Sequence, residues 1–105
     1  MLNFEVVGQK LSLTDEITVV SDTIKYITAK FQFSREWSGL NKVAHFRLED
    51  VVYDILLTDN LILSSDNLNL SAGTWEVYVH GSNETKRITT STIYLLVDQS
   101  GILNG

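Results

Sequence analysis

Apolar and polar side chains alternate along short runs of this sequence, and turn-forming residues interrupt the runs at short intervals. The run Trp75–His80 reads WEVYVH, so every second residue is a large apolar one. Successive side chains of a β-strand point to opposite faces, and a period of two is therefore the pattern of a half-buried strand. A stripe with helical spacing is hard to find anywhere in the chain. The alternation therefore predicts an all-β fold.

The predicted strands lie between clusters of Gly, Asp, Asn and Ser, which favour turns. They are Phe4–Val7, Ile17–Val20, Ile24–Phe33, Val43–Leu48, Val51–Leu57, Leu61–Leu63, Leu68–Leu70, Trp75–His80 and Arg87–Val97. Strands separated by roughly 8–12 residues are typical of a small antiparallel β-sandwich of the immunoglobulin-like kind, with a small β-barrel as the alternative. Alternation is less regular over residues 51–63. This indicates a hairpin that is buried on both sides or that pairs with another chain.

A chain of 105 residues is expected to form a single β-domain over residues 1–105. Hydrophobic residues make up 44% of the chain, and no cysteine is present, so stability must come from the packed core rather than from disulfides. The closing sequence DQSGILNG loses the alternation. Residues 99–105 are therefore expected to be a flexible end or the entry to a linker.

The charge of the chain disfavours two classes of partner. The formal net charge is −5, whereas nucleic-acid binding and attachment to anionic membranes both require a basic surface. The N-terminal sequence MLNFEVVGQK has neither the basic region nor the apolar run of a signal peptide. We therefore expect no nucleic acid and no membrane among the partners, and synthesis in a cytoplasm.

The residue types needed for catalysis or metal binding do not converge. His45 and His80 are the only histidines. Glu76 shares a strand face with His80, but residues four apart on a strand lie about 13 Å from each other, too far to share an ion. The sequence has no GxSxG elbow, no cysteine and no phosphate-binding glycine loop. Adjacent carboxylates at Asp15–Glu16 and Glu49–Asp50 are expected to form turns. We predict no catalytic residue, no metal and no cofactor.

Aromatic residues fall into two groups. Trp75 alternates with Val77 and Val79 and is expected in the core. Tyr26, Tyr78 and Tyr94 fall on the predicted outer faces. Tyrosine is enriched in protein interfaces, because it gives a large contact area at a low entropic cost. These three tyrosines are therefore the candidate interface for a protein or glycan partner.

The stretch FQFSREWSGLNKVAHF raises a separate question, because a tryptophan and a charge pair interrupt its strand pattern. We interpret it as a connection between two strands. Gly39 would permit a tight backbone, and Trp37 would cover the open end of the core. This interpretation leaves open whether the Trp37 ring is covered by its own domain or partly by a neighbour.

Several short motifs occur in order: an aromatic–x–aromatic strand, W-x-G, K-x-A-x-F, then G…W-x-V-x-V-x-G and R-I-T-T…V. The residues that define them structurally are Phe31, Phe33, Trp37, Gly39, Ala44, Phe46 and Trp75. From about residue 24 to residue 101, the chain thereby resembles the N-terminal β-domain of baseplate, tail-fibre and head-fibre proteins from phages of Gram-positive bacteria. It departs from many of those domains in having no proline in the segment before the late strand.

This resemblance implies a non-enzymatic virion structural module, made in the host cytoplasm, that tethers a fibre or baseplate protein to the particle through protein–protein contacts. It implies other virion proteins as partners and a homo-oligomer, with a trimer favoured. The alternative is a carbohydrate- or receptor-binding module that recognises host cell-wall glycans through Trp37 or the tyrosine face.

Overall fold

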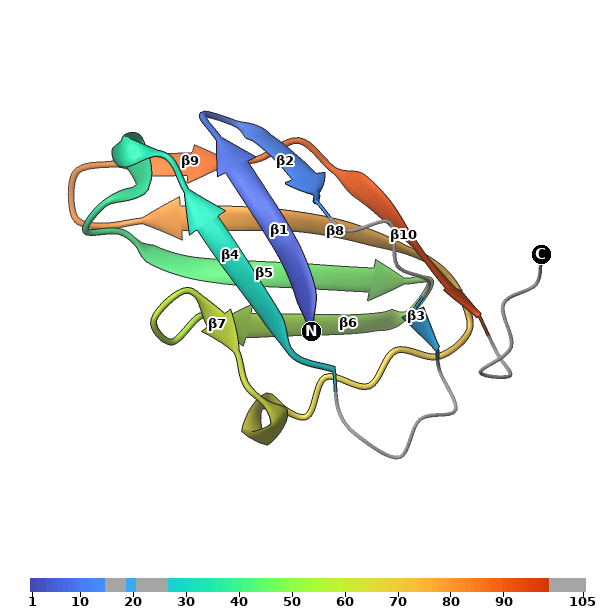
Figure 1. The fold of residues 1–105 in the computed structure, drawn as a ribbon. Coiled ribbons are helices and arrows are strands. Elements are labelled where there is room, and N and C mark those ends of the chain that lie inside the picture. The colour runs from blue at the N-terminus through green and yellow to red at the C-terminus, as the bar shows by residue number, and fades with distance from the viewer. Residues whose placement is uncertain (15–18, 21–26, 99–105) are drawn as a thin grey trace.

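Two β-sheets stacked face to face make up the structure, a computed structural model that describes residues 1–14, 19–20 and 27–98 (Figure 1). The four-stranded sheet has the order β2 (Lys10–Leu13), β1 (Leu2–Val7), β4 (Ala29–Phe33) and β7 (Leu61–Ile62). The six-stranded sheet has the order β3 (Val19–Val20), β10 (Ile93–Asp98), β8 (Gly73–Ser82), β5 (Asn41–Leu48) and β6 (Val51–Leu56), and β9 (Arg87–Thr89) also pairs with β8. The sheets do not close into a barrel, so the predicted small sandwich is confirmed and the barrel alternative is wrong.

Most strand pairs are antiparallel, as expected for a chain with short connections. Two pairs are parallel, β1 with β4 and β10 with β3, and both require a crossover between sequentially distant segments. The alternation of the sequence carries no information on these pairings, because it sets the face of each residue but not the neighbour of each strand.

The core lies between the sheets and is built by the predicted alternation. Trp75, Val77 and Val79 are fully buried on β8. From the other sheet, Phe4 and Phe31 stack on each other with their ring centroids 4.7 Å apart. A single cluster of buried residues joins both sheets. The inner face predicted for Trp75, Val77 and Val79 is therefore confirmed.

The turn at Trp37 connects the two sheets. After β4, residues Arg35–Trp37 form a short 3-10 helix, η1, and Gly39 follows with a φ of +78° before β5 begins. The Trp37 ring is 0% exposed. Its Nε1 donates a hydrogen bond of 2.8 Å to the carbonyl oxygen of Gly8, in the turn between β1 and β2. The ring is thus covered by its own chain.

Three predicted strands differ from the structure. The segment Leu68–Leu70 is not a strand, although the side chains of Leu68 and Leu70 are fully buried. It follows a second 3-10 helix, η2 (Ser64–Asp66), and Asn67 in the left-handed region, and it packs beside the core as a loop. The strand predicted for residues 24–33 begins only at Ala29, and residues 24–26 lie outside the described residues.

The predicted strand Arg87–Val97 is interrupted, so that β9 and β10 pair with β8 separately. Ser91 turns at the break toward the other sheet, where its N–H donates to the carbonyl oxygen of Gln9 at 2.6 Å and its hydroxyl accepts a bond from the N–H of Leu11. Strand β2, which holds Leu11, was not predicted.

The predicted strand Ile17–Val20 is described only at residues 19 and 20, which form β3. The turn expected at Glu49–Asp50 is present, whereas Asp15, Glu16 and the expected linker at 99–105 lie outside the described residues. Within the described residues, no helix is long and apolar enough to cross a membrane.

Candidate functional site

The outer face of the six-stranded sheet carries most of the large exposed hydrophobic side chains on the strands. Directly opposed residues of antiparallel strands project to the same side, so the strand registers define this face. We call the following residues the outer face: Tyr94, Leu96, Thr74, Glu76, Tyr78, His45, Arg47, Val52, Asp54 and Leu56. Each alternates along its strand with residues whose side chains point toward the core.

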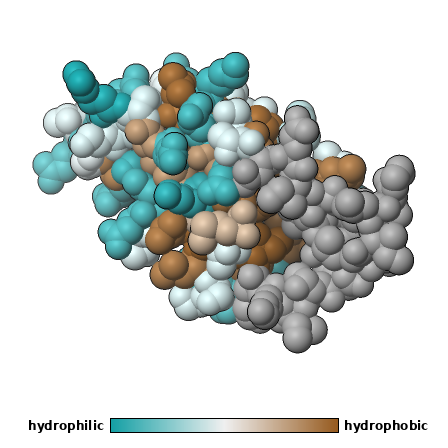
Figure 2. Space-filling model, viewed as in Figure 1, coloured by the Kyte–Doolittle hydropathy of each residue, from teal (hydrophilic) through white to brown (hydrophobic). Residues whose placement is uncertain are grey.

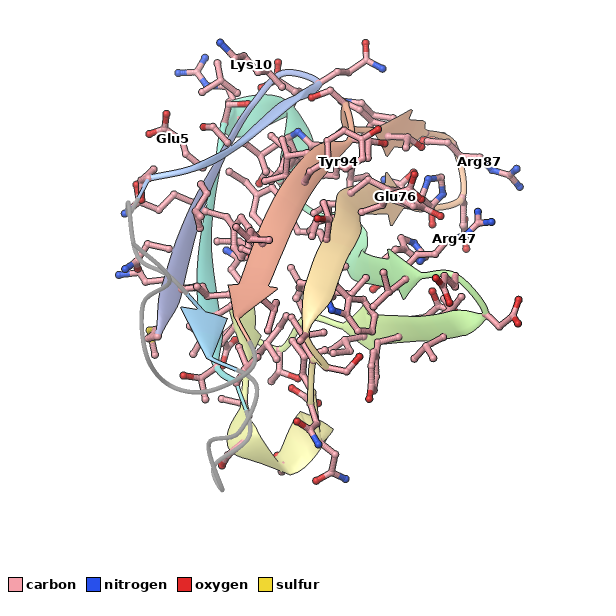
Figure 3. The ribbon with its side chains drawn as sticks, turned by 90° about the vertical axis from the view of Figure 1, so that its right-hand side faces the viewer. Glu5, Lys10, Arg47, Glu76, Arg87 and Tyr94 are labelled. Carbon is pink, nitrogen blue, oxygen red and sulfur yellow. The ribbon has the colours of Figure 1, made fainter. Side chains whose placement is uncertain are left out.

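One row of the outer face runs across three strands. Tyr94 on β10 lies opposite Glu76 on β8, and Glu76 lies opposite Arg47 on β5. Figure 3 shows these side chains following one another across the sheet, with Glu5 and Lys10 on the other side of the sandwich. The Arg47 Nε and the Glu76 Oε2 are 4.0 Å apart, a solvent-exposed ion pair that contributes little to stability.

A depression of about 420 Å³ lies beside this row. It is lined by Arg47, Leu48, Glu49, Thr74, Glu76 and Tyr94. The depression therefore combines one exposed aromatic ring with two carboxylates and a guanidinium group. Such a surface can stack on a ring and donate and accept hydrogen bonds.

A second row of the outer face is held together by internal contacts. The His45 and Tyr78 rings stack with centroids 4.5 Å apart, and the His45 Nδ1 lies 2.5 Å from the Asp54 Oδ1. Both rings are half-buried by these contacts. Tyr78 and His45 therefore contribute to the fold of the face, whereas the more exposed Asp54 carboxylate extends toward solvent.

The apolar residues of the outer face are strongly exposed. The exposed fractions are 67% for Tyr94, 60% for Leu96, 51% for Val52 and 59% for Leu56. Single exposed apolar residues are ordinary on protein surfaces, but a group of them on one face is typical of an interaction site. The face of the other sheet, shown in Figure 2, is largely hydrophilic around β1, β2 and β4, with hydrophobic residues gathered toward β7.

Two residues of the outer face, Tyr94 and Tyr78, are interface candidates from the sequence, and they differ in how much of each is exposed. Tyr94 is 67% exposed, while Tyr78 is partly covered by His45. The third candidate, Tyr26, lies outside the described residues. Trp37 cannot stack on a sugar because it is fully buried, so that part of the glycan hypothesis is wrong.

Leu96, Val52 and Leu56 were missed as surface residues. Each is an apolar residue on the solvent-facing side of its strand, where the alternation predicts a polar residue. The runs IYLLVD and VVYDIL are apolar on both faces, and this was the signal that could have identified them.

The titratable side chains of the described residues form no metal-binding cluster. No three of their His, Asp and Glu side chains are grouped closely enough to hold a metal ion. The only ionisable group of the described residues with a resolved pKa shift is Glu36, on η1. A hydrogen bond from the Ser34 side chain, helped by backbone hydrogen bonding and the charge of Lys86, lowers the pKa of Glu36 below 4.5. Such a shift belongs to a well-hydrogen-bonded turn and indicates no acid–base site.

The class of protein defined by these features is a small two-sheet sandwich whose most prominent surface is an exposed aromatic and apolar sheet face. No family model matches the chain, and no curated protein matches it. Among solved structures, the chain is similar to the N-terminal domain of phage TP901-1 ORF48. The TM-score is 0.55, the match covers 91% of this chain and 96% of that one, and 12% of the residues are identical. This similarity shows a shared fold.

Proposed function

We propose that this chain is a non-enzymatic phage virion structural module that tethers a fibre or baseplate protein to the particle. The observation that carries the proposal is the outer face, where Tyr94, Leu96, Val52 and Leu56 are exposed together. The charged residues Glu76 and Arg47 lie between the apolar residues of β10 and those of β6, because β8 and β5 separate these two strands. Exposed aromatic residues and arginine are both enriched in protein–protein interfaces, and this face presents Tyr94 and Arg47 on one row of the sheet.

Two further observations support a virion role. The sequence motifs around Trp37 and Trp75 resemble those of phage baseplate, tail-fibre and head-fibre domains, and the fold is similar to that of a domain from phage TP901-1. Fold similarity alone does not determine function, so the outer face is needed to complete the argument. Other virion proteins are the proposed partners, and a homo-oligomer, with a trimer favoured, is the proposed state.

Analysis of purified particles tests this proposal. Mass spectrometry of gradient-purified virions of the phage that encodes the chain should detect it at a stoichiometry set by the particle symmetry. Sedimentation of the isolated protein should show the oligomer. Absence of the chain from particles, together with a monomer at all concentrations, would contradict the proposal.

A glycan-binding module is the second candidate, and the depression beside Tyr94 favours it. Exposed tyrosine flanked by Glu76, Glu49 and Arg47 supplies both a stacking surface and hydrogen-bonding groups for a sugar. Calorimetric titration with host cell-wall polysaccharide is the direct test, because both buried tryptophans are poor fluorescent reporters of this surface. Binding that is lost in Tyr94→Ala would support the glycan module over the tethering module.

A further inference from the structure

Strand β6 forms one edge of the six-stranded sheet, and its backbone groups can be assigned individually. The N–H of Leu57 donates to the carbonyl oxygen of Lys42 at 2.8 Å, which makes this pair a hydrogen-bonded one. Hydrogen-bonded and non-hydrogen-bonded pairs alternate along antiparallel strands. The non-hydrogen-bonded pairs of β5 and β6 are therefore Val43–Leu56, His45–Asp54 and Arg47–Val52. In these pairs the N–H and C=O groups of Val52, Asp54 and Leu56 point away from β5, to the edge of the sheet.

The β6 edge lacks the usual protection of edge strands. Natural edges are shielded by lysine, proline, a bulge or a covering segment. The strand reads VVYDIL, with neither proline nor lysine, and Asp54 is its only charged residue. Strand β2, an edge of the other sheet, is partly blocked because the N–H of Leu11 donates to the Ser91 hydroxyl. Within the described residues, no backbone hydrogen bond comparably occupies the outward groups of β6.

The side chains that accompany these backbone groups specify the partner. Val52 and Leu56 are exposed apolar residues, and Asp54 lies between them on the same face. The Asp54 Oδ1 is engaged by His45, whereas no described residue bonds its Oδ2. A partner strand in register would therefore meet an apolar, an acidic and an apolar side chain in succession.

A second copy of this chain fits that edge poorly. Antiparallel pairing of two β6 strands that matches Val52 with Leu56 of the other copy places the two Asp54 carboxylates directly opposite each other. Like charges in that position are destabilising. Shifting one strand by two residues in either direction avoids this contact. Each Asp54 then lies opposite Val52 or Leu56 of the other copy, which leaves a carboxylate facing an aliphatic side chain.

We propose that β6 docks an extended segment of another protein by strand addition, and that this segment carries a lysine or arginine between two apolar residues, in the pattern apolar–x–basic–x–apolar. Main-chain hydrogen bonds to Val52, Asp54 and Leu56 supply affinity, and the basic residue opposite Asp54 supplies register and specificity. The net charge of −5 also favours a basic partner over another copy. This inference rests on the proposed function, since it names how a neighbouring virion protein would bind.

Designed peptides test the inference without any virion component. The acetylated and amidated peptide Thr-Val-Thr-Lys-Thr-Val-Thr presents Val, Lys and Val to the side-chain face of β6. A matched peptide carries Glu in place of Lys. Titration at millimolar concentration, followed by amide NMR shifts of the whole 105-residue protein, should perturb Val52, Asp54 and Leu56. We expect the Lys peptide to bind roughly three- to tenfold more tightly than the Glu peptide.

Three variants make the result decisive. Asp54→Lys should reverse the preference between the two peptides. Val52→Pro removes one outward N–H without breaking a bond to β5 and should abolish binding while the spectrum stays folded. Glu5→Lys, a charge reversal on the other sheet, should change nothing.

Several outcomes would overturn the inference: no perturbation of β6 by either peptide, equal binding of both peptides, or a concentration-dependent dimer that Val52→Pro dissociates. The last result would identify a second copy as the occupant. None of these outcomes bears on whether the chain is found in virions, so failure here is distinguishable from failure of the tethering function.

Discussion

At the scale of single residues, the Trp37 ring packs directly against the backbone of Gly81. A Cβ at Gly81 would lie 2.7 Å from the Trp37 Cζ3 and 2.8 Å from its Cε3. Real Cβ atoms do not approach a ring so closely, and the indole is fixed by its bond to Gly8. The W-x-G motif and the later glycine of V-x-G are therefore linked by one contact.

Gly81→Ala should consequently destabilise the fold by about 1–3 kcal/mol, the cost of overpacking a filled core. Denaturant unfolding measures it. A double mutant with Trp37→Phe should cost less than the sum of the two single changes, because the smaller ring makes room for the methyl group. Additive costs would show that the ring contact is not the cause.

Trp75 and Tyr94 are opposite cases, because Trp75 is fully buried and Tyr94 is 67% exposed. Trp75→Ala should cost about 3–5 kcal/mol, as expected for truncating a large buried aromatic residue. Tyr94→Ala should change stability by no more than about 0.5 kcal/mol, since its ring touches little. Thermal melting of the two variants checks both values. A large loss of stability in Tyr94→Ala would mean that this ring supports the fold and is not free for a partner.

Glu36 provides a pH-dependent prediction. A carboxyl group whose pKa is lowered on folding stabilises the protein at pH values above its unfolded pKa, and this contribution is lost as the pH falls through the folded pKa. Ser34→Ala removes the first cause of the shift and should raise the pKa of Glu36 toward 4.5. Lys86→Met should raise it less, because the lysine is a minor cause. Carbon-13 NMR titration of the carboxyl group measures both changes, and an unaltered pKa in Ser34→Ala would contradict the assignment.

At the scale of elements, the sequence predicts which side of a strand is buried better than it predicts which strands pair with each other. The period of two is local, so it correctly assigned the inner side of β8 from Trp75, Val77 and Val79. The parallel pairing of β1 with β4 joins segments more than 20 residues apart. The break at Ser91 depends on a hydrogen bond to Gln9. Neither interaction can be predicted from the alternation of apolar and polar residues along one strand.

The candidate interface was predicted in part for the same reason. Tyr94 was identified because a tyrosine alternates with apolar residues, but Leu96 beside it was not. An apolar residue on an exposed face looks like a core residue until the other side of the strand is known to be packed. The half-burial of Tyr78 is equally invisible in the sequence, because it depends on the stacking partner His45 from another strand.

Strand β6 allows the edge assignment to be tested by stability alone. Val52→Pro should destabilise the protein by no more than about 1 kcal/mol, because its N–H points away from β5. Tyr53→Pro removes a ladder bond to Phe46 and should cost about 3 kcal/mol or more. The variants Val52→Ala and Tyr53→Ala control for loss of the side chains. Equal damage from the two prolines would show that the ladder register is wrong.

At the scale of the whole molecule, the two sheets have different surfaces. The four-stranded sheet and the Trp37 turn close the core, while the six-stranded sheet presents a long outer face and the β6 edge. A module of this kind has little need of loops to bind, because strands hold its contact residues in fixed positions. A rigid, preformed surface is what the proposed tethering function requires, because it fixes the orientation of the bound module.

The most direct test of this account is binding to particles that lack the chain. Virions produced without it should be mixed with the purified protein and sedimented. Wild-type protein and the charge-reversal control Glu5→Lys should co-sediment, whereas the double variant Tyr94→Ala and Leu96→Ala should lose most of its binding while remaining folded. Co-sedimentation of the double variant at the wild-type level, or no binding by the wild-type protein, would contradict the claim that the outer face tethers this module to the virion.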